Sequence, residues 1–251
     1  MVFEGEINAQ GRSAARLGAE QKPPADVKAA RNFWRAVERV QPGASILGGA
    51  AGRDRTIVVV SGWVSETRIL RDGRRQIFSF LLPGDVAALG SASNIGNHGL
   101  VALTNVEIAD ADALGGGEAG EGQGAWLSDA SRRREERLFE QIVRIGRLSA
   151  RERVLNLLLE LYDRLDAIGL VKEHAFRIPL TQEVFADALG LSVVHINRTL
   201  QHLRREGMVT MGRGTVTLHH RQRLAGFACY QAEVEHGGFD PARRASAARP
   251  N

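Results

Sequence analysis

The chain has 251 residues, of which 43% are hydrophobic and 25% are charged, and it carries a formal net charge of +4. This length allows one large domain or two ordinary ones, and the composition is that of a globular protein that buries a core. A single cysteine, Cys229, excludes an intramolecular disulfide, a cysteine-held iron–sulfur cluster and a cysteine-rich zinc site.

No targeting or membrane-spanning segment is predicted. The N-terminus has no positively charged start that leads into an apolar run, and no run of about 18 apolar residues occurs. We therefore expect a soluble, cytoplasmic protein that has no membrane partner. The positive net charge permits a polyanionic partner but does not require one.

The N-terminal segment divides into two parts. Residues 1–25 are rich in Gly, Ala and Gln and end in Pro23-Pro24, which predicts a flexible leader. From Asp26 to Val40 the apolar residues recur on one helical face, so a short helix is expected there.

From Thr56 the pattern changes to short β-strands. Asp72-Gly73 is a strong hairpin signal between two of them. Strands this short and this closely spaced predict a small antiparallel sandwich or barrel, which we place within residues 26–124. The predicted strands are Thr56–Val60, Trp63–Leu70, Gln76–Leu82, Leu100–Leu103 and Val106–Ile108.

A linker and a long helix are expected next. The Gly- and Glu-rich stretch Gly115–Gly124 has neither a strand–loop–helix context nor a P-loop lysine, so we interpret it as a linker. Within residues 125–148, Leu138, Ile142 and Ile145 recur at four-three spacing beside the charged run RRREER. This spacing is typical of a helix that pairs with another helix, and it predicts a dimer interface at these three residues.

A third domain is expected over residues 149–225, followed by a polar tail, 226–251. Ser149 and Glu152 have the spacing of a capping box, which predicts a helix that begins there and ends near Gly169. Further along, Gly212-Arg213-Gly214 separates two short strand patterns, which predicts a two-stranded wing.

Between these elements lies LTQEVFADALGLSVVHINRTLQHLRREGMV (Leu180–Val209), with two short amphipathic patterns. Thr181 can cap the first helix and Ser192 the second, and Gly207 can end the second. At roughly 100° per residue, the second helix has an apolar side formed by Ile196, Leu200 and Leu203. Its opposite side holds Val194, Arg198, Gln201 and Arg205, flanked by Asn197 and His202.

Two helices joined by a short glycine-containing turn predict a helix-turn-helix, whose second helix lies in the major groove of DNA. The alternative is an ordinary helical hairpin whose charges are merely solvated. The wing that follows and the apolar seam that precedes favour the DNA-binding interpretation.

The order of these elements resembles the Crp–Fnr family of bacterial transcription regulators. The resemblance covers about residues 27–225 and is carried by SGWVSETRILRDGRRQIFSFLLPGD (Ser61–Asp85) and by Leu180–Val209. It implies an α+β fold with an N-terminal antiparallel β-barrel or jelly roll of the cyclic-nucleotide-binding type, a long dimerisation helix and a C-terminal winged helix-turn-helix. It also implies a homodimer on a two-fold DNA operator, RNA polymerase as a partner and an effector pocket in the barrel.

The recognition helix departs from the family pattern at one position. Many members place a Glu, then three residues later a Ser or Gly followed by an Arg; here Val194, Asn197 and Arg198 match these positions. Because a Glu accepts from cytosine N4, its replacement by Val194 is expected to change the sequence that is read, toward contact with a thymine methyl group. We expect base contacts from Val194, Asn197, Arg198 and Gln201, and phosphate contacts from Thr181, Gln182, His195, Arg205 and Arg213.

No cyclic-nucleotide site is expected. The cyclic-AMP-binding members carry Gly-Glu-Leu and Arg-Ser sequences that Val86–Leu100 lacks, and Gln76–Ser131 contains no Lys or Arg. A buried phosphate without a cation leaves its charge unpaired, which is costly. Arg71, Arg74 and Arg75 could serve an anion, but at a hairpin tip such residues more often form a solvated face.

An enzyme is the rival interpretation of such a barrel. A metal-dependent cupin needs a cluster of histidines, and His98 is the only histidine before His174. Ser/His/Asp catalysis also lacks a recognisable motif, so we expect no catalytic residue, no metal and no cofactor. A regulator with an unknown effector and one with no small ligand both remain open.

Overall fold

The computed structural model describes residues 37–46, 55–89, 98–111 and 120–232. The predicted leader, most of the predicted first helix and most of the polar tail lie outside the described residues. Within them, Glu38–Val40 is a strand and not the end of a helix. Its apolar periodicity did not distinguish the two, whereas pairing with a distant strand at Val106–Ile108 determines the observed structure.

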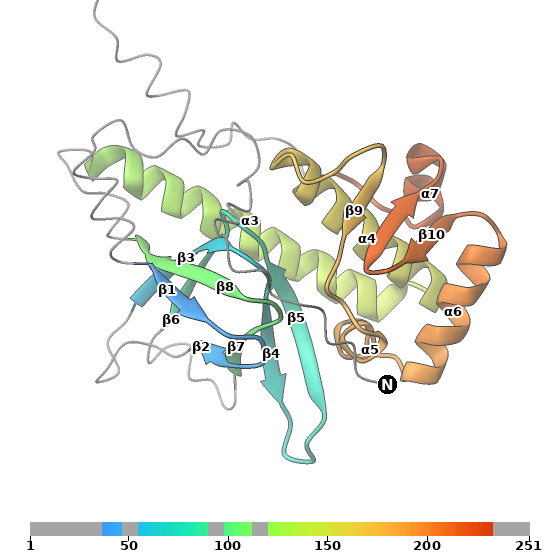
Figure 1. Cartoon of the computed structure of the whole chain (residues 1–251), viewed down its shortest axis with the longest axis horizontal. Coiled ribbons are helices and arrows are strands. Elements are labelled where there is room, and N and C mark those ends of the chain that lie inside the picture. Colours follow the sequence, from blue (N-terminus) through green and yellow to red (C-terminus); the bar gives the residue numbers. More distant parts are fainter. Residues whose placement is uncertain (1–36, 47–54, 90–97, 112–119, 233–251) are drawn as a thin grey trace, which may run out of the picture.

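The N-terminal part is a jelly roll of two four-stranded antiparallel sheets (Figure 1). One sheet has the strand order β1-β8-β3-β6 and the other β2-β7-β4-β5. The expected antiparallel β-barrel or jelly roll is thus confirmed in its jelly-roll form: the described strands form two separate sheets and no closed barrel. The strands are β1 (Glu38–Val40), β2 (Ser45–Ile46), β3 (Arg55–Ser61), β4 (Val64–Ile69), β5 (Arg75–Leu81), β6 (Val86–Leu89), β7 (His98–Ala102) and β8 (Val106–Asp110).

Apolar residues that alternate along the strands fill the space between the sheets. Ile57, Leu81 and Ile108 are fully buried there, each on a different strand. The hairpin at Asp72-Gly73 is confirmed: Gly73 has a φ of 84°, which glycine adopts at no steric cost. Sequence patterns missed β2 and β6, which are too short to show a period.

Two long helices follow the jelly roll. Helix α3 (Gly120–Arg147) runs along the sheets toward the C-terminal lobe (Figure 1). It begins inside the stretch interpreted as a linker, so Gly120–Gly124 is helical despite the low helix propensity of glycine. Helix α4 (Ala150–Ala167) begins as predicted, because the backbone N–H of Ser149 donates to the Glu152 carboxylate at 2.6 Å.

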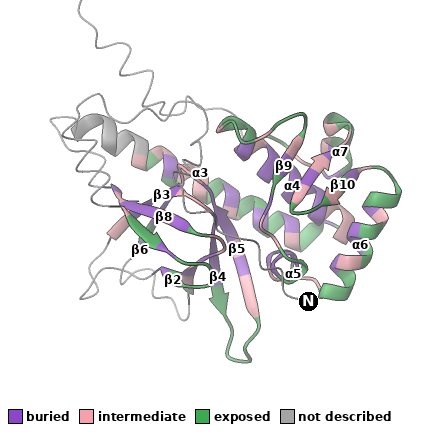
Figure 2. Ribbon diagram, viewed as in Figure 1, coloured by how far each residue is buried: buried purple, intermediate pink, exposed green. Residues whose placement is uncertain are grey.

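The C-terminal lobe is a winged helix-turn-helix. A three-stranded sheet of order β10-β11-β9 packs with the helices around a core that includes Leu155, Phe176 and Phe185. Figure 2 shows this core as the buried side of the helices, while the outer side of α6 is exposed. The elements are β9 (Ala175–Arg177), α5 (Gln182–Leu189), α6 (Val193–Arg205), β10 (Val209–Gly212), β11 (Thr215–Leu218) and α7 (Arg221–Phe227).

A buried ionic network joins the jelly roll to both long helices. Asp85, in the turn after β5, accepts from Arg137 of α3 at 3.1 Å and from Arg164 of α4 at 2.5 Å. Arg164 also pairs with Glu160 at 2.8 Å, and Arg144 of α3 pairs with the same carboxylate. We call these five residues the junction network.

The network makes stability depend on pH. Burial raises the pKa of Asp85, but Arg137 and Arg164 outweigh burial, so this pKa lies below its ordinary value. The pKa of Glu160 is likewise lowered, by Arg144 and Arg164, against the effect of burial. A lowered folded-state pKa stabilises the fold above the ordinary pKa, and this contribution is lost as pH falls through the folded value.

We therefore expect the free energy of unfolding to fall steeply below about pH 4. Asp85→Asn should lower stability at neutral pH and should also flatten this acid limb. Urea unfolding between pH 3 and pH 6 measures both effects, with Asp166→Asn, an exposed aspartate on α4, as the control. An acid limb of unchanged slope in Asp85→Asn would show that Asp85 does not carry the dependence.

Candidate DNA-binding interface

Helix α5 is fixed at both ends. The Thr181 hydroxyl accepts from the Val184 N–H at 3.3 Å, and Gly190 ends the helix in the left-handed region with a φ of 63°. Two carbonyls of the last turn accept from other helices: Ala188 from Gln141 at 2.6 Å and Leu189 from Arg153 at 3.0 Å. The predicted cap and turn are thereby confirmed, and α5 is anchored to α3 and α4.

Helix α6 is positioned by a cap and by one apolar side. The Ser192 hydroxyl accepts from the His195 N–H at 3.2 Å, as predicted. Ile196, Leu200 and Leu203 are buried in the lobe core, and Gly207 follows the helix with a φ of 67°. Because this side packs in the core, the opposite side of α6 faces outward (Figure 2).

The outward side of α6 carries the residues expected to read bases. Val194 is 62% exposed, and Arg198 and Gln201 are exposed as well. Within the described residues Arg198 makes no hydrogen bond or ion pair, so its guanidinium is free for a ligand. Asn197 is half-buried and accepts from Gln201 at 3.0 Å. The sequence missed Val193, which is 42% exposed beside Val194.

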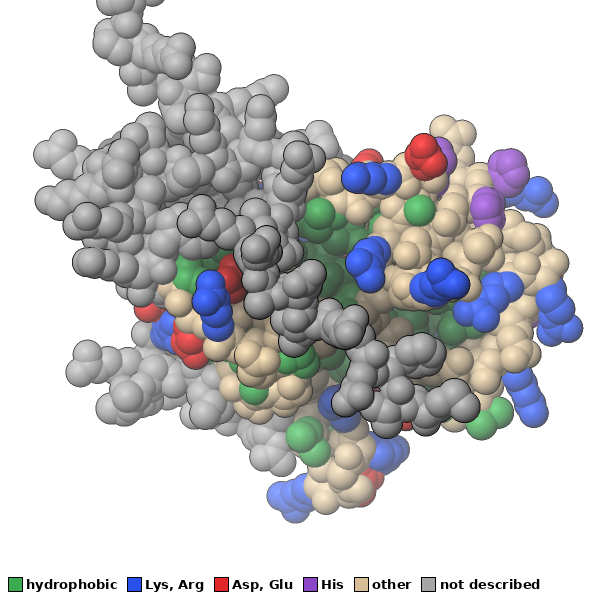
Figure 3. Space-filling view, in the orientation of Figure 1, with side chains coloured by type: hydrophobic (Ala, Val, Ile, Leu, Met, Phe, Trp, Pro, Cys, Tyr) green, Lys and Arg blue, Asp and Glu red, His purple; other side chains and the backbone are tan. Residues whose placement is uncertain are grey.

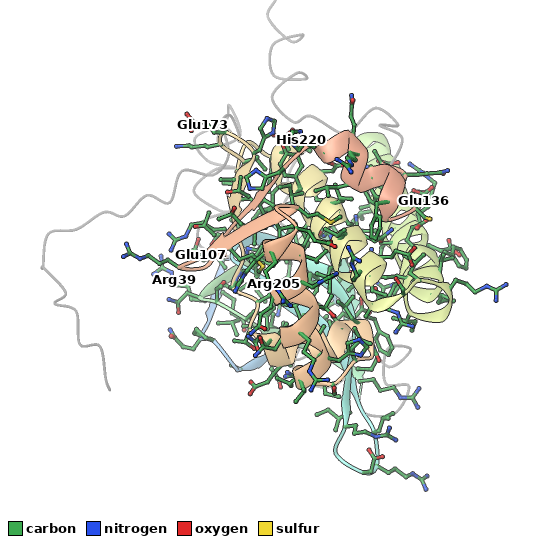
Figure 4. The ribbon with its side chains drawn as sticks, turned by 90° about the vertical axis from the view of Figure 1, so that its right-hand side faces the viewer. Arg39, Glu107, Glu136, Glu173, Arg205 and His220 are labelled. Carbon is green, nitrogen blue, oxygen red and sulfur yellow. The ribbon has the colours of Figure 1, made fainter. Side chains whose placement is uncertain are left out.

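The residues expected to hold phosphates lie around this side. Thr181 and Gln182 are exposed at the start of α5, and His195 is exposed in the first turn of α6. Arg205 lies on α6 in the part of the molecule that faces the viewer in Figure 4. Figure 3 shows Lys and Arg side chains gathered over this lobe. Such a positively charged surface attracts a polyanion.

The wing has the geometry that its sequence predicts. Strands β10 and β11 pair from Val209 opposite Leu218 to Gly212 opposite Thr215. The two-residue turn places Arg213 and Gly214 at positive φ, 49° and 73°, as a type I′ hairpin requires. Arg213 is exposed at the tip.

Helix α3 has an inverted pattern of burial. Its polar residues Arg137, Gln141 and Arg144 are buried against the jelly roll and α4, whereas Ile142 is 62% exposed. The other predicted seam residues, Leu138 and Ile145, are half-buried. Phe139 and Val143, 58% and 49% exposed, extend the apolar surface. They were not predicted, although they lie one turn apart on the same helix. We call these five apolar residues the α3 face.

The jelly roll contacts the helix-turn-helix directly. Arg75 of β5 pairs with Asp187 of α5 at 2.7 Å, and Gln76 donates to the Ala188 carbonyl at 3.4 Å. Treating Arg75 as a solvated residue at a hairpin tip was therefore wrong, because it lies at the start of β5. Arg74 is at the tip and pairs with Asp72.

The helix-turn-helix matches a known family model. The Crp-like helix-turn-helix domain covers residues 152–227. The nitrogen fixation regulation protein FixK of Azorhizobium caulinodans is 30% identical over 67% of this chain and 68% of its own length. The chain belongs to the Crp–Fnr family. The transcriptional activator protein FnrL of Cereibacter sphaeroides is also similar, at 26% identity over 68% of this chain and 71% of its own.

Solved Crp–Fnr structures have the same fold. FixK2 from Bradyrhizobium japonicum is 25% identical and matches with a TM-score of 0.63 over 79% of this chain and 98% of its own. A CRP-family transcriptional regulator from Thermus thermophilus has 20% identity and a TM-score of 0.60 over 78% and 98% of the two chains. The resemblance predicted from the sequence is thus confirmed.

Membership in the Crp–Fnr family makes this chain a DNA-binding transcription regulator. The alternative, a cupin-like enzyme or binding protein, is not favoured. Regulators of this family are generally not enzymes, and they typically act as dimers.

Among the described residues, no three His, Cys, Asp or Glu side chains are grouped to hold a metal ion. No helix of the described part is long and apolar enough to span a membrane. Val86–Leu100 is the segment that lacks the cyclic-AMP-binding sequences. Residues 90–97, about half of this segment, lie outside the described residues.

Proposed function

We propose that this chain regulates transcription as a homodimer that binds a two-fold operator, with one α6 helix in each half-site. Arg198 carries the proposal: it is exposed on the outward side of α6, opposite the buried Ile196, and its side chain makes no hydrogen bond or ion pair within the described residues. Its planar guanidinium offers two parallel donors that match guanine O6 and N7. Val194 then contacts a thymine methyl group, where many members of the family have a Glu.

The dimer forms through the α3 face. Three of its residues are large, apolar and about half exposed or more, a combination typical of a helix whose partner helix is another molecule. In a two-fold dimer built on α3, the two α6 helices lie about 34 Å apart, one turn of DNA.

We assign the remaining roles to the segments predicted from the sequence. Residues 26–124 form the sensing domain, 125–148 most of the dimerisation helix and 149–225 the DNA-binding domain, flanked by the leader 1–25 and the tail 226–251. The dimer contacts RNA polymerase in the cytoplasm and has no catalytic activity. The contacts of β5 with α5 support this proposal, since they join the proposed sensing domain to the helix-turn-helix.

Replacing Arg198 and replacing Arg213 are expected to affect DNA binding in different ways. Arg198→Ala should cost about 1–3 kcal/mol of specific binding, concentrated at one base pair in each half-site, because a bidentate base contact is lost. Arg213→Ala should weaken binding to all sequences alike and reduce the salt dependence, because a phosphate contact is lost. Titrations of both variants with operator and scrambled DNA at several salt concentrations compare them.

Circular dichroism of both variants serves as the control for folding. If folded Arg198→Ala lost affinity for operator and scrambled DNA equally, Arg198 would be a phosphate contact and α6 would not read bases as proposed.

A further inference from the structure

One pair of side chains on α6 is already joined before any DNA is bound. The Gln201 amide donates to the Asn197 carbonyl oxygen at 3.0 Å, across one helical turn. Gln201 is exposed on the outward side of α6, and Asn197 is half-buried at its edge. Each side chain brings an NH₂ group and a carbonyl oxygen, so the pair holds two donor groups and two acceptors.

The internal hydrogen bond fixes what the pair can offer to a ligand. With Gln201 as donor, the groups that take no part in this hydrogen bond are the NH₂ of Asn197 and the carbonyl oxygen of Gln201. If both amides were turned over, the groups outside the hydrogen bond would be the NH₂ of Gln201 and the carbonyl oxygen of Asn197. In either orientation, one donor group on one residue and one acceptor on the other are wholly available to a ligand.

One base edge in the major groove matches this pattern. Adenine presents an acceptor, N7, next to a donor, the N6 amino group. Guanine presents two acceptors, N7 and O6, so one of them would face the free carbonyl oxygen of the pair. Cytosine offers a donor and no acceptor, and thymine offers an acceptor and a methyl group.

We propose that Asn197 and Gln201 act as one unit that reads a single adenine in each half-site. The inference rests on the proposed placement of α6 in the major groove and assigns the chemistry of one base pair in the operator. The competing explanation is a surface pair that only stabilises the helix and does not touch DNA. The two explanations differ in base preference, which is measurable.

The experiment uses the full-length protein and the duplex that it enriches from a random-sequence library. Affinities are measured for that duplex and for every single-base-pair substitution, with the wild type, Asn197→Ala, Gln201→Ala and the double variant. In the wild type, one position of each half-site should prefer adenine by about tenfold or more. Each single variant should reduce this preference to threefold or less. The double variant should lose no more than either single variant, because the unit is broken once.

Gln201→Glu provides a change of specificity. A carboxylate is an acceptor without a donor, so it suits the amino group of cytosine. We expect the preferred base at the same position to become cytosine. Arg198→Ala is the matched control: it should retain the adenine preference and lose a guanine preference at a different position.

The outcomes separate the inference from the function on which it rests. If the wild type enriched no sequence, the proposed function itself would be wrong. If it enriched an operator, but Asn197→Ala or Gln201→Ala retained the full adenine preference, the pair would only stabilise the helix and the inference would be overturned. Additive losses in the double variant would also overturn it, since they would assign the two amides to separate contacts.

Discussion

Replacing Ile142 by Asp should convert the protein to a monomer and abolish operator binding in the same variant. Ile142 is 62% exposed at the centre of the α3 face, next to Phe139 and Val143. A carboxylate there would be buried without a partner in the dimer, which costs roughly hundredfold or more in dimer affinity. Each monomer would then hold one half-site alone and would lose the gain from linking two binding events.

Light scattering at micromolar concentration and operator titration measure the two effects together. Ile142→Leu is the matched control: it keeps the apolar contact and should remain a dimer that binds operator. A monomeric Ile142→Asp variant with undiminished operator affinity would contradict the proposed dimer, and so would a variant that stayed dimeric.

Removing Arg144 should lower the free energy of unfolding by about 3–5 kcal/mol, because it leaves buried polar groups unpaired. Arg144 is only 2% exposed and donates to Glu160, to the Asn156 side-chain oxygen at 2.8 Å and to the Gln141 side-chain oxygen at 2.5 Å. Arg144→Ala would leave Arg164 as the ion-pair partner of Glu160.

Urea unfolding measures this loss, and Arg147→Ala, an exposed arginine at the end of the same helix, is the control. The control should change stability by no more than about 0.5 kcal/mol. An Arg144→Ala loss below about 1 kcal/mol would mean that the junction network contributes little to stability. Replacing Arg144 and Glu160 together by apolar residues should recover part of the loss, because no charge then remains unpaired between them.

The parts of the fold that local sequence determines were predictable. The Thr181 and Ser192 caps, the Gly190 turn and the hairpin at Asp72-Gly73 each depend on a few neighbouring residues, and the structure confirms all of them. The buried side of α6 followed from the period of Ile196 and its apolar neighbours, since one helix face must pack on the core.

Features that depend on distant residues were missed. The short strands β2, β6 and β9 exist because partner strands elsewhere in the chain pair with them, and two to four residues show no period of their own. The burial of Arg137 and Arg144 on α3 was not predicted, because the acids that pair with them, Asp85 and Glu160, lie in other elements.

In the candidate site, too, some features were predicted from the sequence and others were not. Sequence placed Val194, Arg198 and Gln201 on one side of α6, and all three are exposed. Their contacts with bases remain predictions. The hydrogen bond between Asn197 and Gln201 and the pairing of Arg75 with Asp187 were not predicted, because side-chain pairing depends on rotamers and packing that the pattern does not encode.

Selection of bound duplexes from a random-sequence library tests sequence-specific binding by a two-fold dimer most directly. The full-length protein should enrich one palindromic sequence whose half-sites are centred about 10 base pairs apart, as two α6 helices on one face of DNA require. The same selection with Arg198→Ala should yield half-sites that lack the guanine position. Enrichment of a single unpaired half-site, or of no sequence at all, would contradict the homodimeric, base-reading regulator proposed for this chain.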